Sequence, residues 1–401
     1  MVWFNTSNFL NKELGPEYLN FSTGALCLTL EIIEMKKTLI AIAALAVVGA
    51  ASAQVTLYGK IDATVKASTT GKSGATTAAD LTKFSLDSAG LSGSRWGVKG
   101  SEDLGGGLKA SFQLENGFAV DTGAAAQGGL LFGRQAYVTL GGGFGSVSLG
   151  RQYGTIDNVM GYLDVQGYAT NSAMGSAFAG GAHSDGTDGS GRINNSLVYT
   201  TPSVSGFTGV VHYAPGEDKT ATAAATAYSG FYAMYSAGPL FVMGGYEQRN
   251  SQATAAVAAV ASDITTTPIK LGSAAVAAKA SATISGGMIG ATYDLGSVKL
   301  SGAIENGKTT GASDFGYMIG AAIPMGAAAL QLGWASEAQS ADGMVDGTSD
   351  GLGATLVYTL SKRTNVYGSF IRSNVTPAAA TAAAQTKTTT TTYGVGIRHD
   401  F

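Results

Sequence analysis

The sequence has few of the residues that build disulfide-linked or metal-bound proteins. Its 401 residues include one cysteine, three histidines and seven prolines. A single thiol cannot form a disulfide within the chain, and His183, His212 and His399 are too far apart in sequence to form a metal-binding motif. We therefore expect neither a metal site nor a cofactor.

Charge is also scarce. Asp, Glu, Lys and Arg make up 13% of the chain, against about 25% in a typical soluble domain. The formal net charge is only −3. Because the sequence has no strongly basic character, we expect no nucleic-acid partner. A low share of charge is typical of a protein whose outer surface faces lipid.

The N-terminal region has the pattern of a secretory signal peptide that begins inside the chain. Met35-Lys36-Lys37 is basic, residues 38–49 are apolar and uncharged, and Ala51-Ser52-Ala53 is a small-residue cleavage site. We predict a signal peptide at 35–53. Because a signal peptide acts at the N-terminus, we predict that residues 1–34 come from a mis-assigned start and carry no function.

The exported part, residues 54–401, has no long hydrophobic runs. No stretch in it approaches the roughly 18 apolar residues that a membrane-spanning helix requires. Glycine, in contrast, is abundant, with 58 residues in the whole chain. Every backbone polar group in a membrane must be paired inside the protein, so a charge-poor exported chain without spanning helices points to a closed β-barrel.

The first predicted strand shows the two faces of such a barrel. Side chains alternate between the faces of a strand. One face is apolar and the other is polar or charged: Val55, Leu57, Ile61, Ala63 and Val65 against Tyr58, Lys60, Asp62, Thr64 and Lys66. The same alternation recurs at 108–115 and 393–401. In a barrel pore the apolar face contacts lipid and the polar face lines the water-filled lumen.

Connections of two kinds separate the predicted strands. Short turns are expected at 103–107, 141–143, 203–206, 237–239, 295–297, 324–326 and 361–364. Longer loops are expected at 67–80, 153–191, 250–282, 337–349 and 374–391. Alternating short and long connections are typical of outer-membrane barrels. We predict a transmembrane antiparallel β-barrel of about 16 strands, with both chain ends on the periplasmic side.

Six strings occur in order along the exported chain: VTLYG (55–59), GSRWGVKGSEDLG (93–105), LFGRQAYV (131–138), LGRQ (149–152), RINNS (192–196) and GVGIRHDF (394–401). Through them the sequence resembles the Gram-negative general porins, in their β-proteobacterial branch, and the resemblance covers 35–401. It implies a homotrimeric outer-membrane channel that passes small hydrophilic solutes and ions through a lipid bilayer containing lipopolysaccharide.

The resemblance also implies a constriction. The third long loop, about 153–191, would fold into the lumen, with basic residues on the wall facing acids on the loop or wall. The basic positions are Lys60, Arg95, Arg134, Arg151 and Arg192, and the acidic positions are Glu115, Asp157 and Asp164. The Pro-Glu-Phe-Gly stretch of some general porins is absent from this loop. Since basic candidates outnumber acidic ones, we predict weak to moderate anion selectivity.

The final strand is expected to be an assembly signal. Tyr393, Val395, Ile397 and Phe401 share one face. In the resembled family, such a terminal aromatic strand is the address read by the barrel assembly machinery. It would also close the barrel against the first strand, because an open edge in lipid is unfavourable.

Two short motifs fit enzyme signatures without the structure those signatures require. Residues 302–309 match the P-loop pattern, and residues 347–351 match a nucleophile elbow. Neither has the strand–turn–helix context of a true site, so we expect no enzyme activity and no catalytic residues. Aspartates also recur in two predicted outer loops, at Asp185, Asp188, Asp342, Asp346 and Asp350. They could bind divalent cations, but loop acids of this kind are more often only solvated.

Three alternatives remain open. A barrel that acts mainly as an adhesin would have the same strands, and single-channel conductance distinguishes it from a pore. A substrate-specific channel would need an aromatic or charged track for one ligand, which one sequence does not reveal. A soluble β-sandwich is disfavoured by the regular loop alternation and by the terminal strand.

Overall fold

The computed structural model describes residues 55–401, apart from 74–79, 170, 179–190, 222–224 and 252–281. The predictions for residues 1–53, and those for Asp185 and Asp188, lie outside the described residues. Within the described ranges, no helix combines the length and hydropathy that crossing a membrane requires.

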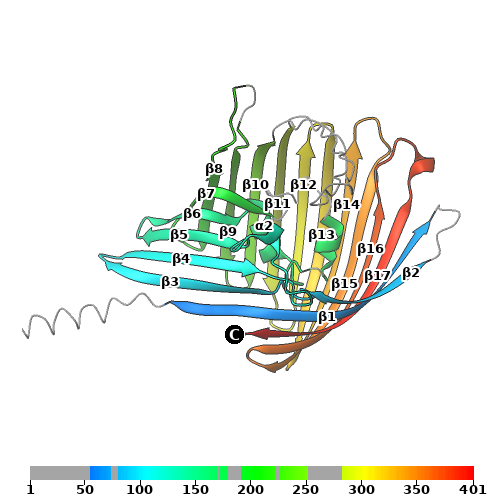
Figure 1. Ribbon diagram of the computed structural model, residues 1–401, viewed down its shortest axis with the longest axis horizontal. Helices are drawn as coiled ribbons and strands as arrows, with labels where there is room; N and C mark the ends of the chain where they lie inside the picture. Colours follow the sequence, from blue (N-terminus) through cyan, green and yellow to red (C-terminus); the bar gives the residue numbers. More distant parts are fainter. Residues whose placement is uncertain (1–54, 74–79, 170, 179–190, 222–224, 252–281) are drawn as a thin grey trace, which may run out of the picture. The chain divides into compact units, whose positions relative to one another are not determined.

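Strands dominate the described chain and form one antiparallel sheet that closes on itself (Figure 1). Closure comes from β17, which pairs with β1 from Ser73↔Lys387 to Lys60↔Asp400. The strands are β1 (Thr56–Ser73), β2 (Leu81–Ser88), β3 (Arg95–Gly105), β4 (Leu108–Gly117), β5 (Gln135–Gly142), β6 (Gly145–Tyr153), β7 (Arg192–Thr200), β8 (Phe207–Ala214), β9 (Tyr228–Ala237), β10 (Leu240–Ser251), β11 (Ala282–Asp294), β12 (Lys299–Thr309), β13 (Ala312–Met325), β14 (Ala328–Ala341), β15 (Gly347–Ser361), β16 (Thr364–Thr376) and β17 (Lys387–Asp400).

Strands β2 and β3 are two halves of a single barrel strand. β3 pairs with residues 56–60 of β1, and β2 pairs with residues 63–70 of the same edge of β1. Residues 89–94 between them leave the sheet. Counted this way the barrel has sixteen strands, which confirms the predicted number.

The seven short turns lie where the sequence predicts them, all at the barrel end where β1 begins and β17 ends. The predicted long loops were partly wrong in extent. β1 continues to Ser73, and only residues 342–346 separate β14 from β15. Ala, Thr, Ser and Gly dominate these segments, yet they form ladders because strand pairing uses the backbone. Loop 250–282 lies almost wholly outside the described residues.

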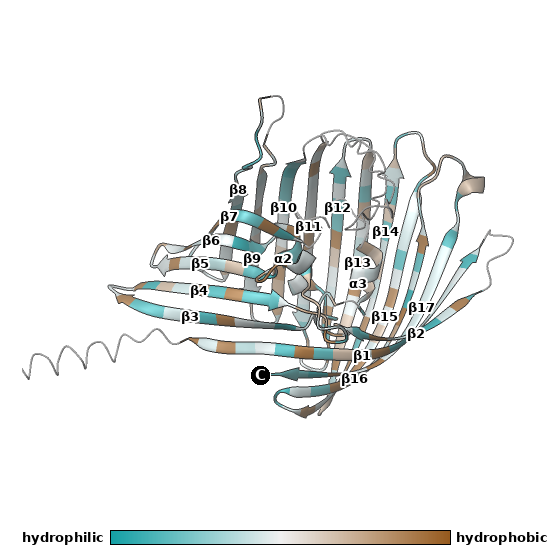
Figure 2. Ribbon diagram, viewed as in Figure 1, coloured by the Kyte–Doolittle hydropathy of each residue, from teal (hydrophilic) through white to brown (hydrophobic). Residues whose placement is uncertain are grey.

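The outer wall is apolar and the inner wall is polar, as alternation predicts. On β1, the side chains of Leu57 and Val65 are 62% and 59% exposed, whereas Asp62 and Thr64 on the other face are fully buried. Figure 2 shows the same alternation as bands of different hydropathy along the strands. Exposed apolar side chains around a closed sheet fit a wall that contacts lipid.

The connection between β6 and β7 enters the barrel, as predicted for the third long loop. It contains α2 (Thr155–Leu163) and α3 (Ala173–Ala177), and we call residues 154–191 the inner loop. Helix α2 packs against β9 to β12, and α3 packs against β14 to β16 (Figure 1). Short 3₁₀ turns also occur in two other connections: η1 (Gln127–Gly129) and η3 (Ala382–Ala384).

Apolar packing holds the inner loop to the wall. Ile156, Val159, Met160 and Leu163 of α2 are all buried. Their partners are inward-facing residues of neighbouring strands: Met243, Met288, Ala303, Met318 and Ala335. Burying one such side chain contributes about 1.5–3 kcal/mol. This layer therefore holds the loop against one side of the barrel wall.

Both enzyme-like motifs lie in the wall. Residues 302–309 belong to β12, which is followed by β13, and residues 347–351 begin β15, which is followed by β16. Neither motif has a helix after it. No group of His, Cys, Asp or Glu in the described part of the chain is arranged to hold a metal ion.

Candidate pore constriction

Three arginines from different parts of the barrel face one cavity beside α2. Arg95 opens β3, Arg134 directly precedes β5, and Arg192 opens β7. All three line a cavity of about 590 Å³, together with Tyr153 and Asp157. Antiparallel pairing brings these residues to similar heights on the wall, although nearly a hundred positions separate the first from the last.

Glu115 of β4 neutralises part of this charge. Arg134 Nε donates to Glu115 Oε1 at 2.7 Å, and Arg95 Nη1 lies 3.9 Å from the same oxygen. Tyr58 donates to the other carboxylate oxygen at 3.0 Å. Glu115 is only 3% exposed. Its carboxylate therefore lies behind the arginines in the wall rather than in the open lumen.

Tyr153, at the end of β6, joins two of the arginines. Its hydroxyl accepts a hydrogen bond from Arg192 Nη2 at 2.7 Å and another from Arg134. The Arg192 guanidinium also lies over the Tyr153 ring, 4.3 Å from its centre. Stacking on an aromatic face holds a guanidinium in place without neutralising it.

The other two predicted basic residues are held outside this group. Arg151 is 8% exposed, and its guanidinium donates to the Gly133 carbonyl at 2.7 Å and to Asn194 Oδ1 at 2.6 Å. A register shift between Gly150 and Gln152 turns Arg151 away from the outward face that simple alternation from Leu149 would give it.

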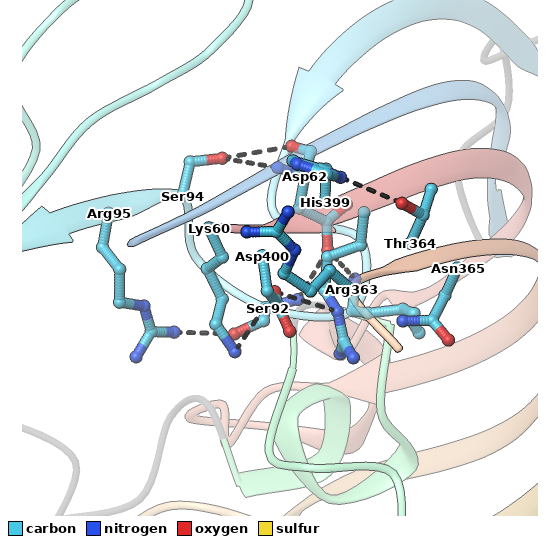
Figure 3. Close-up of polar contacts among 12 residues, drawn as sticks. Lys60, Asp62, Ser92, Ser94, Arg95, Arg363, Thr364, Asn365, His399 and Asp400 are labelled. Atoms are coloured by element: carbon cyan, nitrogen blue, oxygen red, sulfur yellow. Dashed lines mark hydrogen bonds and ion pairs between the residues drawn. The ribbon is translucent and has the colours of Figure 1, made fainter. Parts of the chain in front are cut away.

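Lys60 lies next to Arg95 across the β1–β3 ladder but points toward the C-terminal strand (Figure 3). Its Nζ is 4.0 Å from Asp400 Oδ1, which also lies 3.6 Å from Arg398 Nε. Lys60 and Arg398 therefore continue the basic lining from Arg95 toward the barrel end that carries the C-terminus.

The two predicted loop acids have different surroundings. Asp157 lines the arginine cavity. Burial raises its pKa well above the ordinary aspartate value and the Glu247 carboxylate raises it further, while Arg192 and Arg249 oppose this. Asp164 closes a tight turn instead: its carboxylate accepts from the backbone N–H of Gln166 at 2.8 Å and of Tyr168 at 3.0 Å. Burial also raises the pKa of Asp164.

Sequence reasoning missed the polar anchor of the inner loop. Glu247 of β10 accepts from the Ile156 N–H at 3.0 Å and from the Tyr228 hydroxyl at 2.8 Å. Tyr228 in turn accepts from the Thr155 N–H at 2.8 Å. A carboxylate at the first turn of a helix pairs N–H groups that lack partners within the helix and also interacts favourably with the helix dipole. The sequence signal that could have indicated this anchor is an acidic residue at an inward-facing position of a strand.

The predicted assembly residues form the seam of the barrel. The side chains of Tyr393, Val395 and Ile397 are exposed on the outer wall of β17. Phe401 and Gly59 exchange two backbone hydrogen bonds of 3.0 Å each. A side chain on Gly59 would collide with the Phe401 ring, since its Cβ would lie 2.4 Å from Cζ.

Comparison with known proteins agrees with this architecture. The model of the Gram-negative porin family matches residues 38–378. The chain belongs to the Gram-negative porin family. It is thus an outer-membrane channel protein, and the resemblance read from its motifs is confirmed.

Two relatives match the chain over most of its length. Outer membrane porin protein 32 of Delftia acidovorans is 33% identical, over 92% of this chain and 100% of the relative. An outer membrane porin of Bordetella pertussis is 34% identical with the same coverage. Among solved structures, the anion-selective porin from Comamonas acidovorans has a TM-score of 0.68 and 29% identity, over 87% of this chain and 100% of that chain. A loop-deletion mutant of OmpT from Vibrio cholerae, 17% identical with a TM-score of 0.64, has the same fold.

Proposed function

We propose that this porin is a diffusion channel for small hydrophilic solutes with a preference for anions. The observation that carries the proposal is the shared cavity of Arg95, Arg134 and Arg192, beside which Glu115 is buried in the wall. Fixed positive charge in a narrow aqueous path raises the local concentration of anions. The structural relative from Comamonas acidovorans, described as anion-selective, supports the same sign.

The test is the reversal potential across a planar bilayer that separates two KCl concentrations. The wild-type channel should show a chloride preference, and replacing the three arginines by glutamine should reduce it strongly or abolish it. Arg372→Gln is the matched control, because this arginine is exposed and alternation places it on the outer wall of β16. A cation-selective wild-type channel, or a non-conducting one, would overturn the proposal.

The other partners follow from the family and the outer wall. We propose that three copies assemble, that the apolar wall sits in a bilayer with lipopolysaccharide outside, and that the β17 seam is read by the assembly machinery. We further propose that the protein has no catalytic activity and binds no cofactor. Cross-linking of the purified protein tests the trimer.

The N-terminal assignments also remain proposals. We propose cleavage of a signal peptide at 35–53 and translation from Met35. N-terminal sequencing of the exported protein should begin at Gln54, and the intact mass of the precursor should correspond to a start at Met35. A precursor that carries residues 1–34 would contradict the second assignment.

A further inference from the structure

The inner loop is not the only segment that enters the lumen. Residues 89–94, which connect β2 to β3, leave the sheet and turn inward; we call them the β2–β3 excursion. Ala89, Ser92 and Gly93 line the same cavity as the three arginines. The constriction is therefore shaped by the inner loop and by this excursion.

One buried carboxylate holds the excursion in place. Asp62 of β1 is 0% exposed. Its Oδ2 accepts from the backbone N–H groups of Leu91 and Ser92, both at 2.8 Å, and its Oδ1 accepts from the Gly90 N–H at 3.2 Å. Three successive N–H groups around one anion form a nest, and hydrogen bonds to a charged acceptor are about twice as strong as neutral ones.

Further contacts fix both the carboxylate and its segment. The Tyr367 hydroxyl on β16 donates to Asp62 Oδ1 at 2.5 Å. The Asp62 backbone makes two hydrogen bonds with the Ser94 hydroxyl. The Asp62 N–H donates to Ser94 Oγ at 3.0 Å, and the Asp62 carbonyl accepts from the same hydroxyl (Figure 3). Gly90 is required, because a Cβ there would lie 2.0 Å from the Tyr367 hydroxyl oxygen.

The excursion in turn holds one of the cavity arginines. Arg95 Nε donates to the Gly93 carbonyl at 2.9 Å, and Arg95 Nη2 donates to Ser92 Oγ at 2.6 Å. The guanidinium is thus held by Ser92, whose backbone N–H also bonds Asp62, and by Gly93, the next residue. A continuous path of hydrogen bonds runs from Asp62 through Ser92 to Arg95.

We propose that Asp62 is a positioning residue for anion selectivity: it pins the β2–β3 excursion in the lumen and thereby fixes the Arg95 guanidinium at the constriction. The proposal rests on the anion preference proposed above. It assigns an acidic residue to a function that otherwise depends on basic ones.

The sign of the effect distinguishes positioning from simple electrostatics. Asp62 is a negative charge in the wall of the lumen, so its neutralisation by itself should increase the preference for anions. If Asp62 acts by positioning, its neutralisation should reduce that preference. In Asp62→Asn, the amide NH₂ would face at least one backbone N–H donor of the nest, which would release the excursion and Arg95.

The experiment measures the reversal potential of Asp62→Asn in a KCl gradient. We expect the chloride-to-potassium permeability ratio to fall to that of the Arg95→Gln variant. Asp87→Asn is the matched control. Asp87 of β2 is the register partner of Thr64, two residues after Asp62 on the same face of β1, and its carboxylate lies 3.6 Å from Lys66 Nζ. Its loss should leave the ratio unchanged or raise it. An Asp62→Asn channel with wild-type or greater anion preference would overturn the proposal.

Two further variants keep the test informative if Asp62→Asn does not fold. Ser92→Ala and Tyr367→Phe change no charge, so electrostatics predicts no shift, whereas positioning predicts a lower ratio. In a double-mutant cycle, Asp62→Asn should not lower the ratio further in an Arg95→Gln background, where only the loss of the Asp62 charge remains to act. An equal fall in the ratio in the wild-type and Arg95→Gln backgrounds would refute the hydrogen-bond path from Asp62 to Arg95. A wild-type channel without anion preference would refute the proposed function instead, while the coupling between the two sites would still test the positioning.

Discussion

The Arg192 guanidinium lies over the Tyr153 ring, 4.3 Å from its centre, and Arg192 Nη2 donates to the Tyr153 hydroxyl at 2.7 Å. Tyr153 ends β6 and Arg192 begins β7, so the two residues bracket the whole inner loop. The contact joins the base of the loop to the charge that lines the pore.

Removing the Tyr153 hydroxyl should loosen both arginines that donate to it. Each hydrogen bond to a charged group contributes about 1.5–3 kcal/mol. We therefore expect Tyr153→Phe to lower the anion preference and to increase current noise in the open channel, while the ring still supports Arg192. Tyr213→Phe, at an exposed tyrosine of β8 that does not line the arginine cavity, is the control. Unchanged noise and unchanged reversal potential in Tyr153→Phe would count against this role.

Glu115→Gln should separate stability from selectivity. The variant leaves the buried Arg134 without its partner at 2.7 Å. We expect a loss of about 3 kcal/mol, the lower end for a broken buried ion pair, because glutamine keeps an accepting oxygen. The anion preference should rise, since one negative charge is lost. Urea unfolding and reversal potentials measure the two effects, with the exposed Glu102→Gln as control. A more stable variant would contradict the assignment.

Selectivity should depend on pH through Asp157. Burial and the neighbouring Glu247 hold the pKa of Asp157 well above the ordinary aspartate value, which is about 4. The carboxyl therefore stays protonated to a higher pH than an exposed aspartate. As the pH rises through its pKa, a negative charge appears in the cavity, so the anion preference should fall.

The same shift predicts a change in stability. The folded state binds this proton more tightly than the unfolded state, so Asp157 should lower the free energy of unfolding as the pH rises above the ordinary aspartate value. Reversal potentials and unfolding curves measured over a pH series test both statements. Asp157→Asn should remove this part of each pH dependence. Equal pH dependence in variant and wild type would show that Asp157 is not the titrating group.

The apolar layer under the inner loop should control pore width. Phe178, directly after α3, is 1% exposed. Phe178→Ala should cost about 3–5 kcal/mol of local packing. We expect a less firmly held loop and a larger or more variable single-channel conductance. Phe144→Ala, at an exposed turn residue, should leave the conductance as in the wild type. A stable variant with wild-type conductance would show that packing at Phe178 does not hold the loop.

Deleting Phe401 should impair assembly more than conduction. The deletion removes two backbone hydrogen bonds to Gly59 at the β1–β17 seam, whereas the hydrogen bonds that hold the cavity arginines to Glu115, Tyr153 and Ser92 do not involve Phe401. We expect a lower yield of folded, protease-resistant barrel in the outer membrane, with near-normal conductance for the channels that do assemble. Phe401→Tyr keeps the ring and is the control. A normal trimer yield after the deletion would refute the proposed signal.

The sequence alone determined the class of fold and the two faces of the wall. Alternation is a local property with a period of two residues, so Leu57 and Val65 could be placed outside, and Lys60 and Asp62 inside, without knowing any partner strand. Turn residues such as Gly142 and Gly238 likewise mark chain reversal within a few positions. These features explain why the strand number and the short turns were predictable.

Only the tertiary structure decided which inward-facing residues meet. Lateral neighbours depend on strand register and on bulges, and both are set by pairing between distant segments. The register shift between Gly150 and Gln152 therefore turned Arg151 away from the outer face, and hydrogen bonds to Gly133 and Asn194 hold it apart from the arginine cavity, although its sequence context resembles that of Arg134. The nest around Asp62 depends on β1, β16 and the β2–β3 excursion together. No local pattern distinguishes that carboxylate from any other acid on a polar face.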